Sequence, residues 1–520
     1  ELAHVFHMDR VRGLWRVGQW VFGRNPFLFP NTYSPSWLAE GVAVHYESKL
    51  TGAGRVYGTD FGAIVRAHEN AGTVPGPHQL SAATPLYPLG NLAYVYGTQL
   101  VERVASHGGP DGMRTFVDVS AGRVIPYLLN TNAEAAFGIG FDSAYTEWAD
   151  SAHREAQRLF RNIDEVLVAG GTNAANVVRV DQYYTSPDVV DAYHETRRAY
   201  FKGKIPVSTS NLHRRFARAG QSMEVQVMAA VPDGDFKVRH EANAGTYKIH
   251  HSSGYSPALS AGDLRFVPGQ TAEALDEKEP GVDPEARRGR GLWKGTPIKL
   301  ETDFIIRKKL QPTLKAVGAD LDTVVKAQVY LRDQNDVANF RAVWAQQFPV
   351  EPVTTIIATE TPGFIMPESR IEINTIALAK DGKTKKEVIA PVPPLFKGAT
   401  TAIRAGDLLF ISGLMAVRDG ALVPGANVDA TQPFFGIPVK AELREILSQA
   451  EAICRAAGTT LRNAVRIQQF HSDLADLPAA LEVWAEATDN MPLPLSPVEV
   501  PWLPVPGARL QLDLWVYVPA

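Results

Sequence analysis

Three stretches of this 520-residue chain share one pattern, and that pattern decides the predicted fold. They are "AGGTNAANVVRVDQYYTSPDVVDAYHETRRAYF" (169–201), "AVGADLDTVVKAQVYLRDQNDVANFRAVWAQQF" (316–348) and "AAGTTLRNAVRIQQFHSDLADLPAALEVWAEAT" (456–488). Each begins at a glycine that ends a helix, continues as an alternating β-rich run, and passes through an Asp-containing turn into a second amphipathic helix. The repeat makes Val178, Val325 and Val465 equivalent, at spacings of 147 and 140 residues. Each spacing is about the length of one small domain.

Two flanking patterns complete the repeated unit. "YSPALSAGDLRFVPGQ" (255–270) and "TTAIRAGDLLFISGL" (400–414) share A-G-D-L-x-F, in which glycine and aspartate form a hairpin turn between alternating strands. Closing strands follow in "SMEVQVMAAV" (222–231), "SRIEINTIALA" (369–379) and "ARLQLDLWVYV" (508–518). The order strand pair, helix, strand, helix, strand predicts an α+β fold with helices on one face of a mixed sheet.

We therefore predict α+β modules at 158–250, 251–390 and 391–520, named the first, second and third modules, after a domain at 1–157. The first module has no A-G-D-L hairpin. Another segment must supply its missing strands, or its sheet keeps an unpaired edge.

The repeated pattern resembles the Rid (YjgF-like) family of small chorismate-mutase-like domains over about residues 160–520. Members usually form homotrimers, which implies that three modules in one chain make a covalent pseudo-trimer with ligand pockets at the module junctions. Active Rid proteins hydrolyse enamines and imines to a keto acid and ammonia. The resemblance implies an arginine just after a proline that holds the substrate carboxylate through its planar guanidinium, and a glutamate on the last strand that positions water. It implies no cofactor for these modules.

Other residue types occupy these family positions here. The arginine position holds Ser208, Thr354 and Leu495, and the glutamate position holds Gln226, Asn374 and Asp513. None of them replaces a guanidinium, which argues against the family's deaminase activity.

Three residues of the modules remain candidates for chemistry. Arg214 and Arg370 lie near the family's site and are candidate substrate-binding residues, or else solvated surface charges. Asp513 is a candidate catalytic residue. It alternates with Leu512 and Leu514, so it faces either a ligand pocket or solvent.

The first 157 residues carry a second signal. "ELAHVFHM" (1–8) and "PSWLAEGVAVHYE" (35–47) together resemble the gluzincin metallopeptidases, as do the stretches at 92–117 and 135–151. The resemblance assigns Glu1 as general base, His4 and Glu40 as zinc ligands, and Tyr94 or Tyr96 as the oxyanion stabiliser. The first histidine of H-E-x-x-H would precede Glu1. Since catalytic zinc needs three protein ligands, the zinc site is predicted to be incomplete in this chain. The chain is then a piece of something larger or a natural fusion with lost parts.

Composition narrows the range of partners. The net charge of −4 gives no reason to expect nucleic acid, and no apolar run approaches the ~20 residues of a membrane helix. We expect a soluble protein without a membrane partner, with the cytoplasm favoured. Cys454, the only cysteine, is predicted to be a buried helical residue.

Three functions follow as hypotheses. The first is a Rid-like hydrolase or small-molecule-binding protein acting at intermodule clefts, as a pseudo-trimer or a larger homo-oligomer. The second is a zinc peptidase acting on peptides, with accessory Rid modules. The third is a non-catalytic scaffold.

Overall fold

A computed structural model gives the structure of the chain. It describes residues 2–51, 54–56, 60–61, 64–65, 75, 79–81, 89–109, 111–125, 127–218, 221–232, 236–245, 254–274, 281–287, 295–360, 364, 368–418, 420–426, 431 and 436–519. The chain divides into two compact units. Unit 1 comprises Glu1–Glu155 with Ser186–Asp191, and unit 2 comprises Ala156–Thr185 with Ala192–Ala520.

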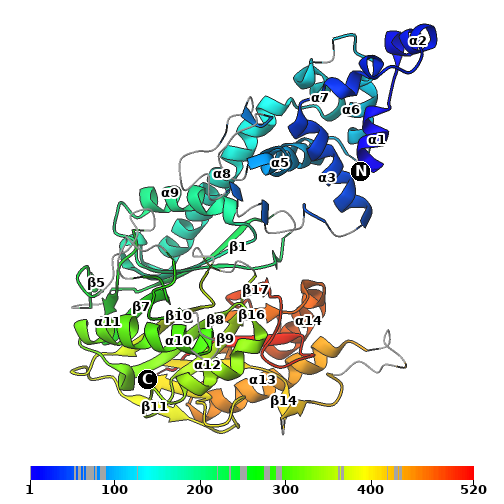
Figure 1. Ribbon diagram of the computed structural model, residues 1–520. Coiled ribbons are helices and arrows are strands. Elements are labelled where there is room, and N and C mark those ends of the chain that lie inside the picture. The colour runs from blue at the N-terminus through cyan, green and yellow to red at the C-terminus, as the bar shows by residue number, and fades with distance from the viewer. Residues whose placement is uncertain are drawn as a thin grey trace. The chain divides into compact units, whose positions relative to one another are not determined.

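Unit 1 is helical (Figure 1). Its helices are α1 (Leu2–Met8), α2 (Gly13–Phe22), α3 (Ser36–Thr51), α5 (Leu92–His107), α6 (Gly112–Ser120), α7 (Leu129–Phe137) and the first part of α8 (Phe141–Ala169). A core of apolar side chains joins α3, α5, α6 and α7. The predicted domain boundary at 157 lies inside the continuous helix α8.

Helices α3 and α5 pack unusually closely because each carries a glycine at the crossing. A Cβ atom added to Gly97 would lie 1.9 Å from the carbonyl oxygen of Trp37, and one added to Gly41 would lie 2.4 Å from that of Gly97. Any side chain at either position would therefore force the helices apart. The "W-L-A-E-G" stretch thus fixes the position of Glu40, which is next to Gly41.

Unit 2 contains three main sheets. The strands of the second sheet, in spatial order, are β5 (Val238–His240), β6 (Leu259–Ala261), β7 (Leu264–Thr271), β10 (Ile371–Leu378), β8 (Val324–Leu331) and β9 (Val353–Ala358). Those of the third are β11 (Lys386–Ile389), β12 (Ala402–Ala405), β13 (Leu408–Leu414), β18 (Leu510–Tyr517), β16 (Ala464–His471), β17 (Leu495–Glu499) and β3 (Arg215–Phe216). Those of the first are β2 (Val207–Leu212), β1 (Val177–Tyr184) and β4 (Met223–Ala229).

The same pairing recurs in all three sheets. In the second sheet, the strand of the repeat, β8, pairs in parallel with β9, which follows the helix, and antiparallel with the closing strand β10. β1 pairs in the same way with β2 and β4, and β16 with β17 and β18. In the second and third sheets the closing strand also pairs antiparallel with the A-G-D-L hairpin. Mixed sheets of this kind confirm the predicted α+β class.

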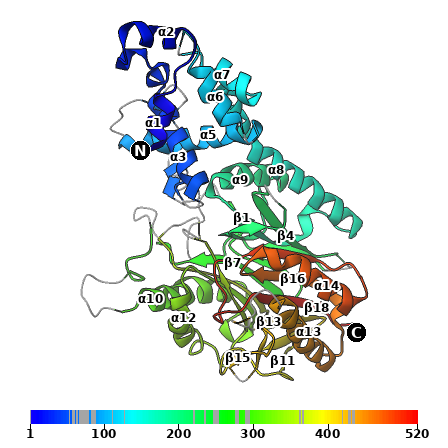
Figure 2. The same cartoon turned by 90° about the vertical axis from the view of Figure 1, so that its right-hand side faces the viewer.

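Helices cover one face of these sheets. α10 (Pro297–Phe304) and α12 (Val337–Trp344) share an apolar core with the second sheet, and α13 (Pro438–Ala456) and α14 (Leu477–Thr488) share one with the third (Figure 2). The first module contributes the end of α8 and α9 (Val190–Tyr200). Cys454 is buried in α13, as predicted.

The second module differs from the third by a one-residue insertion in the helical segment between Glu301 and Gly318. Between α10 and α11 (Gln311–Ala316), the segment Ile305–Leu310 is a π-helix. Glu301 lies 17 residues before Gly318, whereas Glu442 lies 16 before Gly458. A π-turn absorbs such an extra residue. Glu301 and Glu442 accordingly both accept a backbone N–H at the start of the closing strand, from Arg370 at 2.8 Å and from Arg509 at 2.9 Å.

The first sheet is the incomplete one. No hairpin strand pairs with β4 in the described part of the chain, so β4 is an edge strand, whereas β10 and β18 each lie between two strands. Two other strands of the first module pair outside their own sheet. β3 joins the third sheet and β5 joins the second.

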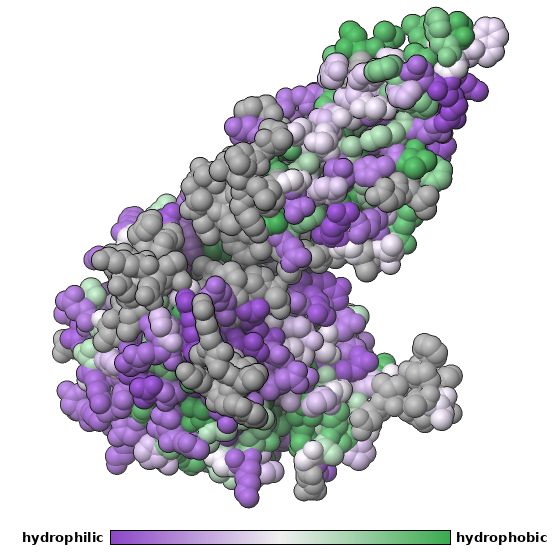
Figure 3. Space-filling view, in the orientation of Figure 1, coloured by the Kyte–Doolittle hydropathy of each residue, from purple (hydrophilic) through white to green (hydrophobic). Residues whose placement is uncertain are grey.

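Surface hydrophobicity is concentrated in unit 1. Leu14, Val17 and Trp20 of α2 are strongly exposed, Trp20 to 86%, and Figure 3 shows apolar atoms gathered over this helix. No helix within the described ranges combines the length and apolar character needed to cross a bilayer.

Candidate functional site

Two of the predicted zinc ligands meet in unit 1. His4 Nε2 of α1 lies 3.0 Å from Glu40 Oε2 of α3, and both side chains are about one-fifth exposed. Tetrahedral zinc with donors at ~2.0–2.1 Å separates two ligand atoms by roughly 3.3 Å, so this pair has a suitable spacing. Glu1 lies outside the described residues.

No third ligand from the described residues joins this pair. Among the residues that can be placed, no group of three His, Cys, Asp or Glu side chains could hold a metal ion. Burial, with a contribution from His4, lowers the pKa of His7 to about 4. His45 pairs with Glu102 at 2.7 Å instead of joining His4. The described residues therefore fit two positions of a zinc site and do not complete it.

The two tyrosines differ in environment. The guanidinium carbon of Arg55 lies 5.1 Å from the centre of the half-buried Tyr94 ring. Tyr96 is buried in the core of unit 1.

A buried polar cluster lies where the three sheets of unit 2 face one another. Its members come from equivalent positions of the repeats and from β18: Arg179, Asp181, Tyr183, Lys326, Gln328, Tyr330, Arg466, Gln468 and Asp513. We name this set the central polar cluster. All three modules supply a cation at the same position, namely Arg179, Lys326 and Arg466.

Lys326 is fully satisfied within this cluster. Its ammonium group lies 2.9 Å from an Asp513 oxygen and donates to Thr355 Oγ1 at 2.9 Å and to the Ile411 carbonyl at 3.0 Å. Three donors therefore have three acceptors. Burial lowers the pKa of Lys326 to about 8, an effect that Asp513 opposes.

Asp513 is buried, which excludes the alternative that its side chain faces solvent. Its side chain is fully buried and accepts from Gln328 at 3.1 Å as well as facing Lys326. Burial by itself would raise the pKa of Asp513, but the charges of Lys326 and Arg466 lower it overall. A carboxylate held in this way is a structural counter-ion and has little basicity.

The family's glutamate positions share one geometry. Asp513 of the third module reaches Lys326 of the second, and Asn374 of the second donates to Thr209 of the first at 3.0 Å. Gln226 of the first accepts from Arg466 of the third at 3.0 Å. Each module thus contacts the next in a closed cycle, and each position has a polar partner in a neighbouring module.

The family's arginine position in the first module faces a guanidinium from another element. Arg197 of α9 is fully buried and donates to Ser208 Oγ at 2.9 Å and to Gln182 Oε1 at 2.8 Å. Trp344 and Trp484 occupy the equivalent positions of the other two modules. Trp344 donates to Thr354, the second module's residue at the arginine position. Sequence reasoning missed Arg197, although the repeat spacing that aligns the valines also aligns this residue.

The two candidate substrate-binding arginines are engaged in ion pairs. Arg214 Nε lies 2.6 Å from Glu360, and Arg370 Nε lies 2.8 Å from Asp336. Arg509 repeats the second pairing in the third module, 2.7 Å from Asp476. At the Nε atoms of Arg214 and Arg370, a substrate carboxylate would have to compete with Glu360 and Asp336.

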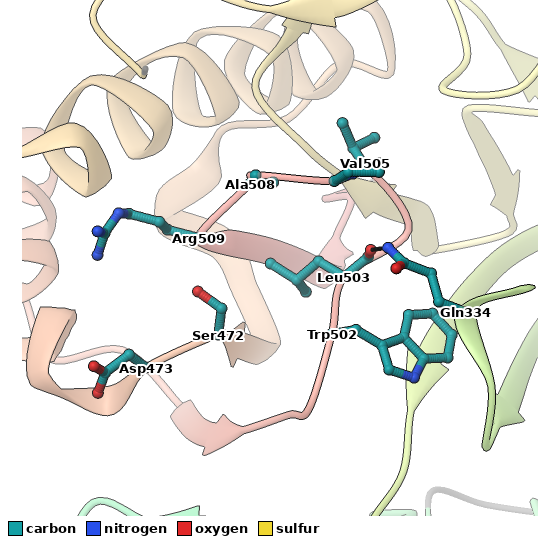
Figure 4. Close-up of a pocket in the computed structure, with 10 residues that line it drawn as sticks. Gln334, Ser472, Asp473, Trp502, Leu503, Val505, Ala508 and Arg509 are labelled. Carbon is teal, nitrogen blue, oxygen red and sulfur yellow. Dashed lines mark hydrogen bonds between the residues drawn. The ribbon is translucent and has the colours of Figure 1, made fainter. Parts of the chain in front are cut away.

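A cavity of about 450 Å³ lies between the second and third modules (Figure 4). Gln334, which follows β8, comes from the second module, and all other lining residues come from the third: Ser472, Asp473, Trp502, Leu503, Val505, Pro506, Gly507, Ala508 and Arg509. Arg509, Ser472 and Asp473 lie toward one end, and Trp502 and Gln334 toward the other (Figure 4). Gln334 donates to the Leu503 carbonyl at 2.8 Å, which ties the lining loop to the second module.

Comparison with known proteins agrees with this architecture. The family described as endoribonuclease L-PSP matches residues 246–379 and 397–518. The mitochondrial protein mmf2 of Schizosaccharomyces pombe is 32% identical over 92 residues, and a RutC family protein of Pyrococcus abyssi is 35% identical over 94; each match covers 18% of this chain. The chain spans 64% and 63% of the length of these two relatives. A RutC family protein of Saccharolobus solfataricus is 30% identical over 125 residues, which are 24% of this chain and 85% of the relative.

Solved structures of other proteins are similar to about a quarter of the chain. The Rid family protein YyfA of Yersinia pestis shares 24% identity, with a TM-score of 0.22, and the match covers 26% of this chain and all of that one. Yeast Mmf1 shares 21% identity with the same TM-score and covers 28% of this chain.

Repeated mixed sheets with helices on one face define an α+β protein of the L-PSP type. Through residues 246–518, in two parts, the chain belongs to the Rid (YjgF) family.

Proposed function

We propose that this protein is a small-molecule-binding member of the Rid family whose three modules form a covalent pseudo-trimer. The cavity between the second and third modules is the observation that carries this proposal. Its volume lies within the ~300–1,000 Å³ of ligand pockets, and it combines an apolar wall with a few polar groups, as such pockets do.

The lining favours a ligand with both charges and an apolar body. Arg509 uses Nη1 for Asp476, and Nε and Nη2 have no hydrogen bond among the described residues, so they can receive a carboxylate. The half-exposed Asp473 carboxylate pairs with Arg215 at 3.1 Å through Oδ1, so an ammonium group would bind at its other oxygen, Oδ2. Leu503, Val505 and Trp502 provide the apolar wall. An amino-acid-like zwitterion with a sizeable apolar side chain matches this arrangement.

Titration calorimetry with L-phenylalanine tests the proposal, with phenylacetate and phenethylamine as ligands lacking one charge. We expect saturable binding of the zwitterion, weaker binding of the other two, and at least tenfold weaker binding to Arg509→Met. Arg370→Met is the matched control, because Arg370 makes the same ion pair in the second module without lining this cavity. Equal effects of the two substitutions, or no binding, would contradict the proposal.

Imine hydrolysis is not the activity that we propose. The arginine positions hold Ser208, Thr354 and Leu495, and the glutamate-position residue Asp513 is buried against Lys326. We expect no ammonia release above the uncatalysed rate from 2-iminopropanoate. Release at the rate of an active family member would contradict this expectation.

A zinc peptidase is the second candidate, and the 3.0 Å approach of His4 and Glu40 favours it. Zinc, when bound, would polarise a peptide carbonyl or activate a water molecule. His4 and Glu40 would hold the zinc ion, but the described residues supply no third ligand. Zinc content measured on a chain carrying one added histidine before Glu1 tests this reading. We expect about one zinc per chain, lost in His4→Ala and retained in His45→Ala.

A further inference from the structure

Two of the three module junctions in unit 2 are covered by an A-G-D-L hairpin. Val178 of the first module packs in one apolar cluster with Leu259 and Phe266 of the second module's hairpin, and β1 contacts both β6 and β7. Val325 of the second module packs in the same cluster with Phe410 of the third module's hairpin. Val178 is 4% exposed and Val325 is fully buried.

The third junction lacks this cover. Val465, the equivalent residue of the third module, is 49% exposed. By the cyclic order of the modules, the hairpin that would cover it belongs to the first module, and the first module has none. The same missing hairpin leaves β4 without a second neighbour among the strands that the structure describes.

We infer that the edge of β4, which is unpaired among the described strands, together with Val465 is a docking surface for an extended β-hairpin of a partner protein. The two covered junctions define what fits. An incoming strand must run antiparallel to β4, satisfy its free backbone groups, and place apolar side chains at alternate positions so that they cover Val465.

Neither of the two A-G-D-L hairpins of this chain can be the occupant. Both A-G-D-L hairpins are already built into their own sheets, and their phenylalanines Phe266 and Phe410 are 4% and 0% exposed. In a second copy of the chain, the same two hairpins are likewise paired with the closing strands of their own sheets. Its described residues therefore offer no free A-G-D-L hairpin, and it could pair through its own β4 edge.

Peptides from this chain serve as probes because they carry the required pattern. Labelled peptides of residues 255–270 and 400–414 would be titrated with the full 520-residue protein, with fluorescence anisotropy as the readout and scrambled peptides as controls. We expect saturable binding of the native-order peptides only. Val465→Lys should weaken it at least tenfold, and Leu481→Lys, at a residue 44% exposed on α14 of the same module, should leave it unchanged.

Hydrogen exchange locates the binding. Amide protection on β4 upon peptide addition would support the inference. Protection elsewhere, or equal affinity of the two lysine variants, would overturn it. Light scattering of the free protein tests whether a second copy of the chain occupies this surface. A dimer that dissociates in Val465→Lys would show that β4 pairs with the β4 of another copy. That result would overturn the assignment to a partner hairpin.

Discussion

The junction between the second and third modules and the junction between the third and first are built from equivalent strands but differ in what covers them. At the former, the hairpin β12–β13 buries Val325, and Lys326 meets Asp513 with every donor satisfied. At the latter, the equivalent cation Arg466 is likewise buried, yet Val465 beside it is half exposed. The comparison teaches that the burial of a residue at a repeated position depends on the neighbouring module that packs against it. The sequence of the residue's own repeat does not determine that burial.

The largest difference should appear when lysine replaces the equivalent valines. Val325→Lys places an ammonium group at a fully buried position without a partner, so we expect unit 2 to lose about 4 kcal/mol or more of unfolding free energy. Val465→Lys should change it by less than about 0.5 kcal/mol because the side chain can reach water. Denaturant unfolding followed by circular dichroism gives both values. Similar losses in the two variants would refute the difference between the junctions.

The ion pair at the covered junction should give the next largest effect. Lys326→Met leaves the Asp513 carboxylate buried without its counter-ion, which costs about 3–5 kcal/mol. The double variant Lys326→Met/Asp513→Asn should recover most of that loss. Lys380, which is 51% exposed and pairs with Asp320, is the control, and Lys380→Met should leave the unfolding free energy nearly unchanged because solvent screens this pair. A double variant no more stable than Lys326→Met would show that the ion pair is not the source of the effect.

A smaller, pH-dependent effect should come from Glu372 of the closing strand β10. Burial, reinforced by Asp181, raises the pKa of Glu372 to about 8 from an ordinary value of 4.5. Because the folded-state pKa is the higher one, its contribution to stability is complete below pH 4.5 and is lost as the pH rises through 8. Between pH 5 and 8 the protein should lose at most about 3–4 kcal/mol of unfolding free energy relative to Glu372→Gln.

The third module supplies the reciprocal control for this prediction. Gln511, buried on β18, occupies the equivalent position and does not titrate. Gln511→Glu should introduce a similar decline of unfolding free energy with pH. Parallel stability profiles for the protein and Glu372→Gln would show that Glu372 titrates normally.

Much of the fold of unit 2 could be predicted because the repeats carry their own alignment. The spacing of Val178, Val325 and Val465 located three equivalent strands. These valines are the second residues of β1, β8 and β16, respectively. The A-G-D-L motifs located both hairpins, and the Rid family was confirmed over residues 246–518. Periodicity works here because strand and helix patterns differ over short windows.

The candidate sites were less accessible to sequence reasoning. The lining of the cavity comes largely from the loop 502–509, whose path depends on Gln334 of another module. Arg197 was overlooked because its neighbour Ser208 is brought to it only by folding. The partners of Arg214 and Arg370 could not be foreseen either, since Glu360 and Asp336 are distant in sequence.

The sequence by itself determined the repeated α+β unit and the missing A-G-D-L hairpin of the first module, and it predicted the loss of the family's arginine. Only the tertiary structure decided that Asp513 is a buried counter-ion, that a cavity lies beside Arg509, and that Val465 is exposed where Val325 is not. The physical reason is that hydrophobic periodicity is a local property of the chain. Burial and charge pairing depend on which distant segments meet, and no local pattern encodes that choice.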